Sequence, residues 1–459
     1  MSGPIKTIMF AALILGSDGA FAQTPAPAAP LTAVHCGHLI DTDAGKLLGA
    51  TTVLIEAGRV RSVTAGVQTP TGATEIDLTG ATCLPGLIDS HTHLTLQITP
   101  SYYIDQFHWN IADYTIRGTV NARRTLLAGF TTVRNVGDRQ NETVALRNAI
   151  NAGVIPGPRI FTAGMPISST GGHADATNGY RLDLAGDPGV AAGIINNVDD
   201  AVKAVRLHYK LGDDLIKIMP SGGVLDESNS GDNPQLTLEE IKAVVSAAHD
   251  YGFTVAAHAH GAEAIRRAVL GGVDSIEHGT FMNDEDMRLM KEHGTWYVPT
   301  IIAGTFVAEK ANVPGYYPPQ VAVKASAIGP KILATAGKAY SAGVKIAFGT
   351  DAGVYPHGEN AQEFALMVRA GMSSMFAIQA ATTHAAQLLK RSQDLGSVAP
   401  GKYADLIAVA GNPLEDINLL TQVRFVMKEG VVFKLDGAPV QIGAEAPATL
   451  VWDQQAPAF

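Results

Sequence analysis

Cysteine, basic clusters and long apolar runs are all scarce in this chain of 459 residues. Only two cysteines occur, Cys36 and Cys83, and neither belongs to a CxxC zinc pattern. No segment reaches the roughly 20 consecutive apolar residues that a membrane-spanning helix needs. The 33 lysine and arginine residues form no cluster and are outnumbered by 43 aspartate and glutamate residues, which gives a net charge of −10. We therefore expect neither nucleic acid nor a membrane as a partner.

The two cysteines leave their redox state open. In an exported protein they could be joined, but a disulfide requires the two Cα atoms to approach within about 7 Å, and sequence does not reveal that distance. We predict two buried free thiols, with a disulfide between Cys36 and Cys83 as the alternative.

The N-terminus has the pattern of a secretory signal peptide over residues 1–22. Lys6 gives a weakly positive start, an apolar run extends from Ile8 to Leu15, and residues 20–22 form an A-x-A cleavage site. Residues 23–30 (QTPAPAAP) form a Pro/Ala linker that is not expected to pack. We predict that the mature protein is exported, to a periplasm or out of the cell; an uncleaved N-terminus is the alternative.

Two strand-rich flanks surround a longer, alternating middle. The flanks, residues 31–82 and 396–459, carry β-branched runs separated by Gly-rich turns, which predicts one small β-sandwich built from both chain ends. The middle, residues 83–395, alternates eight apolar runs with helical stretches such as 237–252, for which Thr237 is the expected N-cap. This α/β pattern predicts a (β/α)8 TIM barrel, with a doubly wound open sheet as the alternative. The runs are 84–94, 130–137, 159–164, 215–223, 254–261, 275–281, 296–301 and 345–353.

Polar side chains gather at the ends of these runs. His91 and His93 are two residues apart at the end of the first run, so on a strand both imidazoles point to one face. His258, His278 and Asp351 end the fifth, sixth and eighth runs. Because active-site residues of such a barrel lie at the C-terminal ends of its strands, these residues are predicted to meet as metal ligands.

Lys217 stands inside the fourth run, between two isoleucines. Burying a charged lysine is costly, so an isolated example usually reaches the surface or pairs with an acid. A neutral amine beside metal cations can instead react with carbon dioxide to form a carbamate. That anion has two oxygens and could bridge two cations held by four histidines and one aspartate.

The combined pattern resembles the amidohydrolase superfamily. The motifs that carry the resemblance cover essentially the whole mature chain, and the nearest likeness is to the imidazolonepropionase-like branch, which includes Xaa-Pro and Xaa-Arg/Lys dipeptidases and ochratoxin-hydrolysing amidohydrolases. The motifs are LPGLIDSHTH (84–93), GFTTVRN (129–135), STGGHAD (169–175), IKIMPSGGV (216–224), AHAHG (257–261), SIEHGT (275–280), FGTDAG (348–353) and GKYADLIAVAGNPLEDI (401–417).

The resemblance implies a site with two divalent metal ions, which we expect to be zinc, and a carboxylated Lys217. One metal would be held by His91, His93 and Asp351, and the other by His258 and His278. A bridging hydroxide would attack the substrate, with Asp351 as general base and then acid.

Two further histidines are candidates for contacts with the substrate. His260 shares a strand face with His258, and His173 lies in a Gly-rich loop; both are predicted to contact or polarise the substrate carbonyl, with a packed or exposed histidine as the alternative.

The function predicted from these observations is hydrolysis of an amide or peptide bond in a dipeptide or N-acyl amino acid, by a protein that is expected to form homo-oligomers. A lactone, cyclic amide or phosphoester is the alternative substrate, and a binding protein without activity is the non-enzyme alternative. Arg181 is a candidate partner for a substrate carboxylate, and the acidic residues Asp226, Glu227 and Asp232 could favour a basic substrate. The resembling dipeptidases tend to carry Gln followed by an aromatic residue where this chain has Gln235-Leu236, so a dipeptidase specificity is in doubt.

Overall fold

A computed structural model describes residues 30–228 and 230–440 of the chain. The predicted signal peptide, almost all of the linker and the last part of the C-terminal flank lie outside these residues. Within the described part, no helix combines the length and apolar character needed to cross a bilayer.

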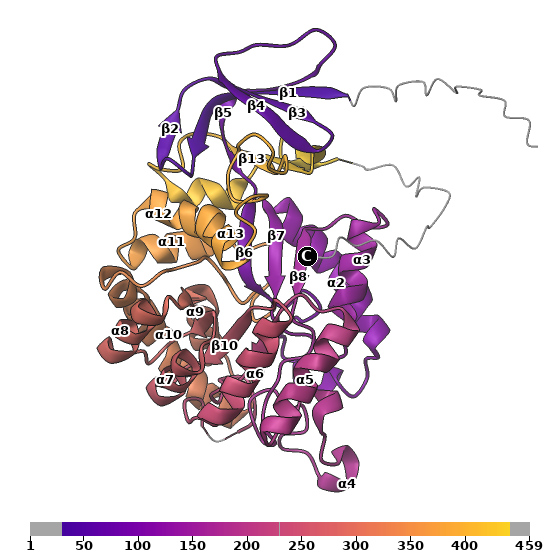
Figure 1. The fold of residues 1–459 in the computed structure, drawn as a ribbon, viewed down its shortest axis with the longest axis vertical. Helices are drawn as coiled ribbons and strands as arrows, with labels where there is room; N and C mark the ends of the chain where they lie inside the picture. The colour runs from indigo at the N-terminus through magenta and orange to yellow at the C-terminus, as the bar shows by residue number, and fades with distance from the viewer. Residues whose placement is uncertain (1–29, 229, 441–459) are drawn as a thin grey trace, which may run out of the picture.

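Both chain ends build one nine-stranded sheet, which lies at the top of Figure 1. At its centre, β1 (Leu31–Asp41) pairs antiparallel with β3 (Thr51–Glu56) and parallel with β5 (Thr74–Pro85). Strand β5 also pairs antiparallel with β13 (Leu406–Val409), and this pairing joins the two chain ends. The described pairing records a single sheet, so the shared origin from both flanks is observed but the two sheets of a sandwich are not confirmed. The remaining strands are β2 (Lys46–Leu48), β4 (Arg59–Ala65), β14 (Phe425–Lys428), β15 (Val431–Leu435) and β16 (Ala438–Pro439).

The prediction of two free thiols is wrong, because Cys36 and Cys83 form a disulfide with a Cα–Cα distance of 5.8 Å. The two cysteines lie on adjacent strands, and the register of the β1–β5 pair shifts between Cys36 and His38. The shift depends on Gly37, since a Cβ there would lie 2.1 Å from the carbonyl oxygen of Thr79. Nothing in the spacing of the cysteines reveals that β1 and β5 are neighbours.

The middle of the chain forms two parallel sheets. One contains β6 (Leu87–Thr92), β7 (Phe130–Asn135) and β8 (Arg159–Thr162). The other contains, in spatial order, β12 (Trp296–Val298), β11 (Ser275–His278), β10 (Val255–Ala259) and β9 (Ile216–Ile218). Seven of the eight predicted runs thus contain a strand, in the predicted order.

The eighth run, 345–353, makes single bridges rather than a ladder. Ile346 pairs with Tyr297 of β12, and Ala352 pairs with Thr92 of β6. One more bridge, between Ile167 and Ile218, links the segment after β8 to β9. The eighth run thereby contacts both sheets, although the recorded ladders do not form one closed barrel.

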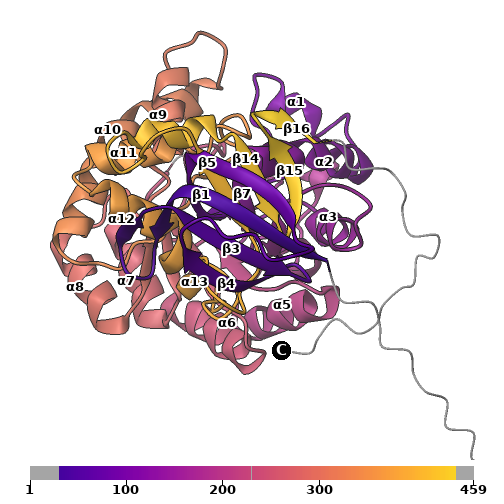
Figure 2. The ribbon, with the colours of Figure 1, turned by 90° about the horizontal axis from the view of Figure 1, so that it is seen from above.

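The helices lie in a ring around the sheets when the molecule is seen from above (Figure 2). The predicted helix at 237–252 is confirmed as α6 (Leu238–Asp250), whose N-cap Thr237 accepts a hydrogen bond from the Glu240 amide, 3.2 Å. The other helices are α1 (Tyr102–Asp105), α2 (Ile111–Leu127), α3 (Glu142–Asn151), α4 (Leu182–Ala185), α5 (Val198–Leu211), α7 (Ala262–Gly271), α8 (Asp284–His293), α9 (Ile301–Lys310), α10 (Pro319–Ser341), α11 (Gln362–Arg369), α12 (Ser374–Gln379) and α13 (Ala385–Leu388).

Candidate metal centre

The structure brings all of the predicted ligands to one cavity of about 820 Å³. Each comes from the end of a strand or from a segment that follows one, except Lys217, which is the middle residue of β9. The candidates His173 and His260 line the same cavity. The ligand residues in its lining are His91, His93, Lys217, His258, His278 and Asp351.

The Asp351 carboxylate lies close to both His91 at the end of β6 and His93 just beyond it. Its Oδ1 is 3.2 Å from His93 Nε2 and 3.5 Å from His91 Nε2. One ligand atom from each of His91, His278 and Asp351 lies within 4.8 Å of the other two, which is a spacing that one cation could share. The ring centroid of His278 lies 4.8 Å from that of His91 and 4.6 Å from that of His258. His278 therefore links the pair His91 and His93 to His258.

Two of these ligands have left-handed backbone, with φ of +69° at His278 and +61° at Asp351. Such a conformation costs free energy for a residue with a Cβ. Hydrogen bonds hold both in place: Asp351 donates its amide to the His91 carbonyl at 2.7 Å, and the Tyr297 hydroxyl donates to the His278 carbonyl at 2.8 Å.

Hydrogen bonds to Nδ1 orient most of the imidazoles. His91 bonds Glu277 at 2.8 Å, His93 bonds the Gly137 carbonyl at 3.0 Å, and His278 bonds Thr300 at 2.7 Å. These contacts leave the Nε2 atoms directed to the cavity, as metal-ligating histidines require. His258 differs, because its Nε2 lies 3.1 Å from the Gly222 carbonyl.

The protonation states suit a cation. Burial lowers the pKa of His91 to about 4, and it lowers those of His258 and His278 well below the usual value, so these rings are neutral near pH 7. Burial acts to raise the pKa of Asp351, but the neighbouring His91 and the hydrogen bond from His93 hold it below its usual range. The group therefore offers neutral imidazoles and one carboxylate, which is the donor set that a divalent metal takes.

Lys217 is 1% exposed and lies among these residues. Burial lowers its pKa to about 8, although Glu277 and Asp351 act in the opposite direction. The lowered pKa increases the neutral fraction of the amine, which is the form that reacts with carbon dioxide.

A buried ion pair beneath the site was not predicted from the sequence. Glu277 accepts hydrogen bonds from Arg134 Nη2 at 2.8 Å and Ser275 Oγ at 2.5 Å, and its other oxygen bonds His91. Burial acts to raise the pKa of Glu277, but Arg134 and His91 lower it to about 2. Both charged residues stand in fully buried strands, but each has a polar neighbour, Asn135 or His278, so the signal that singled out Lys217 between two isoleucines does not identify them.

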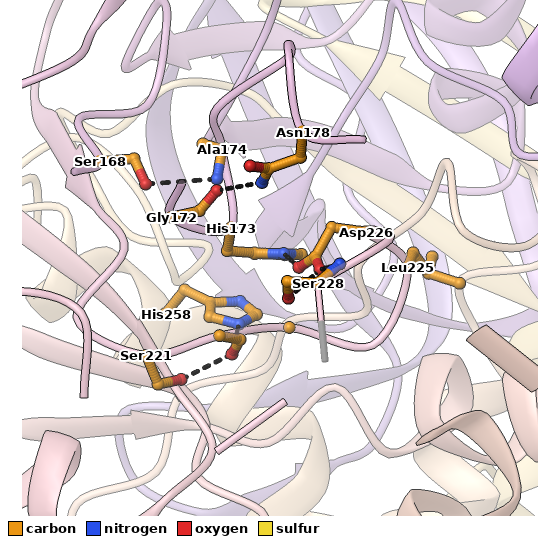
Figure 3. Close-up of polar contacts among 12 residues, drawn as sticks. Ser168, Gly172, His173, Ala174, Asn178, Ser221, Leu225, Asp226, Ser228 and His258 are labelled. Atoms are coloured by element: carbon orange, nitrogen blue, oxygen red, sulfur yellow. Dashed lines mark hydrogen bonds and ion pairs between the residues drawn. The ribbon is translucent and has the colours of Figure 1, made fainter. Parts of the chain in front are cut away.

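The loop that contains His173 holds this side chain over His258 (Figure 3). Its ring stacks on that of His258 with 4.4 Å between centroids, and its Nδ1 bonds the Asp226 carboxylate. The stacking depends on Gly223, because a Cβ at that position would lie 2.0 Å from His173 Cε1.

Lys324 of α10 holds the neighbouring segment 223–228, which contains Asp226. Its ammonium donates to the carbonyl oxygens of Gly223, Asp226 and Ser228 at 2.8–2.9 Å and to the Asp226 carboxylate at 3.1 Å. The Asp226 carboxylate is therefore engaged by three residues, His173, Lys324 and Ser228, and is not free to bind a basic substrate. Of the predicted acidic residues, Glu227 lines the cavity and Asp232 does not.

Arg181 is an ordinary surface arginine and is not placed to bind a substrate carboxylate. Its side chain is 74% exposed, pairs with Asp183 and does not line the cavity. Leu236 is buried and is likewise absent from the lining. The arginine that does line the cavity is Arg139.

Comparison with known proteins gives one consistent result. Residues 82–433 match the amidohydrolase family. Ochratoxinase from Aspergillus niger is 34% identical over 374 residues, which cover 77% of this chain and 76% of that protein. Imidazolonepropionase from Cutibacterium acnes is 25% identical over 381 residues, covering 78% of this chain and 83% of that protein.

Solved structures agree with these relatives. A Xaa-Pro dipeptidase with methionine bound in the active site is 47% identical, with a TM-score of 0.84 and coverage of 88% of this chain and 100% of that one. A prolidase complexed with N-methylphosphonate-L-proline is 32% identical, with a TM-score of 0.80 and the same coverage of each chain.

The ion pair beneath the site yields a prediction about stability. We expect Arg134→Met to destabilise the protein by about 3–5 kcal/mol, since it leaves the Glu277 carboxylate buried without its charged partner. The double variant Arg134→Met/Glu277→Gln should lose less than the sum of the two single variants, because each substitution relieves the other. Urea denaturation measures all three, with Arg288→Met as an exposed control that should leave the midpoint nearly unchanged. Strictly additive losses would contradict the coupling.

Proposed function

The chain belongs to the amidohydrolase family, and from this premise we propose that it is a binuclear metal-dependent hydrolase that cleaves the amide bond of a dipeptide or an N-acyl amino acid. The observation that carries the proposal is the meeting of four histidines, one carboxylate and one buried amine in a single cavity. Methionine and N-methylphosphonate-L-proline, bound by two similar proteins, support the substrate class, since each is an amino acid or an acylated-amine mimic with a free carboxylate.

We assign the ligands as the contacts group them. His91, His93 and Asp351 would hold one cation, because Asp351 Oδ1 lies within 3.5 Å of both histidines. His258 and His278 would hold the second, and a carboxylated Lys217 would bridge the two. Two divalent cations, which we take to be zinc, would supply a water of lowered pKa and polarise the scissile carbonyl.

Asp351 is the residue placed to move the proton. Hydrolysis adds water across the C–N bond, so one proton must travel from the water to the leaving nitrogen. The low pKa of Asp351 means that it begins as a carboxylate and can accept that proton. Returning the proton to the amine completes the cycle.

His260 and His173 are proposed to contact the substrate. The Nδ1 atom of His260 lies 2.8 Å from Thr280 Oγ1, and its amide donates to Ser221 Oγ at 3.0 Å, so the orientation of the ring is fixed. His173 is fixed by Asp226 in the same way. Both residues line the cavity with fixed ring orientations, so they would need little rearrangement to contact a bound substrate.

The bridging role of Lys217 can be tested by removing its amine. We expect Lys217→Ala to lose bound metal and to lower kcat by about a thousandfold or more, because several kcal/mol of stabilisation depend on the metal pair. Elemental analysis of metal per chain and hydrolysis of a dipeptide library measure the two effects. Lys338→Ala, an exposed lysine of α10, serves as the control. Full activity or two retained metals in the Lys217 variant would refute the assignment.

The segment 223–228, whose Asp226 orients His173, gives a separate prediction. Lys324→Met removes four hydrogen bonds from the loop at 223–228 and should lower kcat about tenfold or more by misplacing His173. The metal content should stay at two ions per chain, since Lys324 contacts none of the ligands. Lys338→Met, on the same helix, should match the wild type in both measurements. Loss of metal in the Lys324 variant would contradict a role confined to positioning.

We also propose that the protein is exported. The Cys36–Cys83 disulfide supports this, because such bridges persist in oxidising compartments. Mass spectrometry of the protein from its native host should find a chain that begins at Gln23 and that alkylation of the unfolded, unreduced chain leaves unmodified. A chain that retains residues 1–22 and two alkylated thiols would contradict export.

A further inference from the structure

Arg139 brings a positive charge to the cavity close to the ligand set. It follows β7 and lies two residues beyond Gly137, whose carbonyl oxygen is bonded by His93. It is the one arginine among the described residues that line the cavity. Arg139 therefore lines the same cavity as the proposed metal ligands without being one of them.

The neighbouring acids do not neutralise this guanidinium. Asp138 accepts the amides of Asn141 and Thr143 at 2.9 and 3.1 Å, together with the Thr143 hydroxyl. Glu142 accepts the backbone amides of Arg139 and Gln140 and the Thr95 hydroxyl. Both carboxylates thus close the turn that begins α3, and Glu142 bonds the backbone amide of Arg139 rather than its side chain.

Arg139 is also left short of partners. Over residues 30–228 and 230–440, its side chain forms no ion pair, and its one recorded side-chain hydrogen bond is a long contact of 3.4 Å to the Tyr102 hydroxyl. Its Nε is buried without an acceptor. Arg139 as a whole is half-buried, but a guanidinium binds anions through several donors, and an orphaned donor next to a cavity indicates a ligand that completes it.

Aromatic rings hold the guanidinium in place. Its Cζ lies 5.0 Å from the centre of the Tyr114 ring and 5.7 Å from that of Tyr102. Trp109 packs edge-on against Tyr114 at 5.3 Å, and all three rings line the cavity. These contacts restrain the planar group, so little entropy is lost when it binds a carboxylate with both terminal nitrogens.

We propose that Arg139 binds the free α-carboxylate of the substrate and that Tyr102, Trp109 and Tyr114 receive the apolar side chain next to it. This inference rests on the proposed function and narrows it. The substrates are N-acyl amino acids or dipeptides that end in a large apolar residue with a free carboxylate. Amides and esters of the same residues lack the charge that Arg139 requires.

The test compares two pairs of probes on the metal-loaded enzyme. L-Phenylalanine and L-phenylalaninamide differ only in the carboxylate and are measured by calorimetric binding. N-Acetyl-L-phenylalanine and its amide are measured by hydrolysis. The variants are Arg139→Met and Arg139→Lys, with Arg181→Met as the matched control, since Arg181 lies outside the cavity and pairs with Asp183.

We expect the wild type to prefer the carboxylate probe of each pair. Arg139→Met should weaken L-phenylalanine binding about 10- to 100-fold, the value of a charge-assisted hydrogen bond, and raise KM for the acetylated acid with a smaller effect on kcat. Binding of the amide should change by less than about twofold, because it lacks the charged partner. Arg139→Lys should recover part of the affinity, and Arg181→Met should match the wild type.

The outcomes separate the two claims. Equal wild-type affinity for the acid and its amide, or an equal loss of both in Arg139→Met, would overturn the carboxylate site. Arg139-dependent binding of L-phenylalanine by an enzyme that hydrolyses no amide would uphold the carboxylate site and overturn the proposed function.

Discussion

The ion pair between Arg134 and Glu277 supports the site from below. Both side chains are almost fully buried, and each would be costly to leave unpaired in the interior. Arg134 also donates to the Ser90 carbonyl and to Ser275, so the pair ties β6, β7 and β11 together at the level of the ligands. The second oxygen of Glu277 bonds His91, so the position of His91 depends on the ion pair. Neither Arg134 nor Glu277 lines the cavity itself.

The same low polarity that makes this pair necessary also prepares the ligands. Burial removes the proton from His91, His258 and His278 near neutral pH and weakens the hold of Lys217 on its own proton. Among the proposed ligands, Asp351 keeps a negative charge, because its neighbours His91 and His93 compensate for the effect of burial on its pKa. Desolvating these groups and holding His278 and Asp351 in left-handed backbone conformations costs free energy. The result is a set of donors already oriented and in the protonation states that bind cations.

Sequence reasoning found the ligand positions because parallel strands bring their C-terminal ends to one place. Residues as distant as His91 and Asp351 could therefore be grouped from the strand pattern alone. The comparisons with known proteins confirm the family that this grouping indicated. No such rule links β1 to β5, and the disulfide between Cys36 and Cys83 was accordingly missed.

The loop residue His173 was among the predicted site residues, but Lys324 and Arg139 were not. Lys324 approaches from α10, 98 residues after Asp226, and no periodicity connects the two. Arg139 was not identified among the candidates, because sequence does not tell whether a guanidinium such as that of Arg181 or Arg139 meets an acid nearby. Asp183 neutralises the first, whereas the acids beside the second are bound to backbone amides.

These two kinds of contact suggest a division between the floor and the rim of the cavity. The floor is built from strands, and the terminal sheet braces it: Arg159 of β8 donates to Asp405 at 2.7 Å and also pairs with Glu429. A rigid floor keeps the ligands at fixed distances, which any amide hydrolysis at this site would need. The rim consists of the segments around Arg139 and His173, each held by its own local hydrogen bonds. Substitutions there can alter which substrate fits without disturbing the ion pair beneath His91, so chemistry and specificity can change independently in this fold.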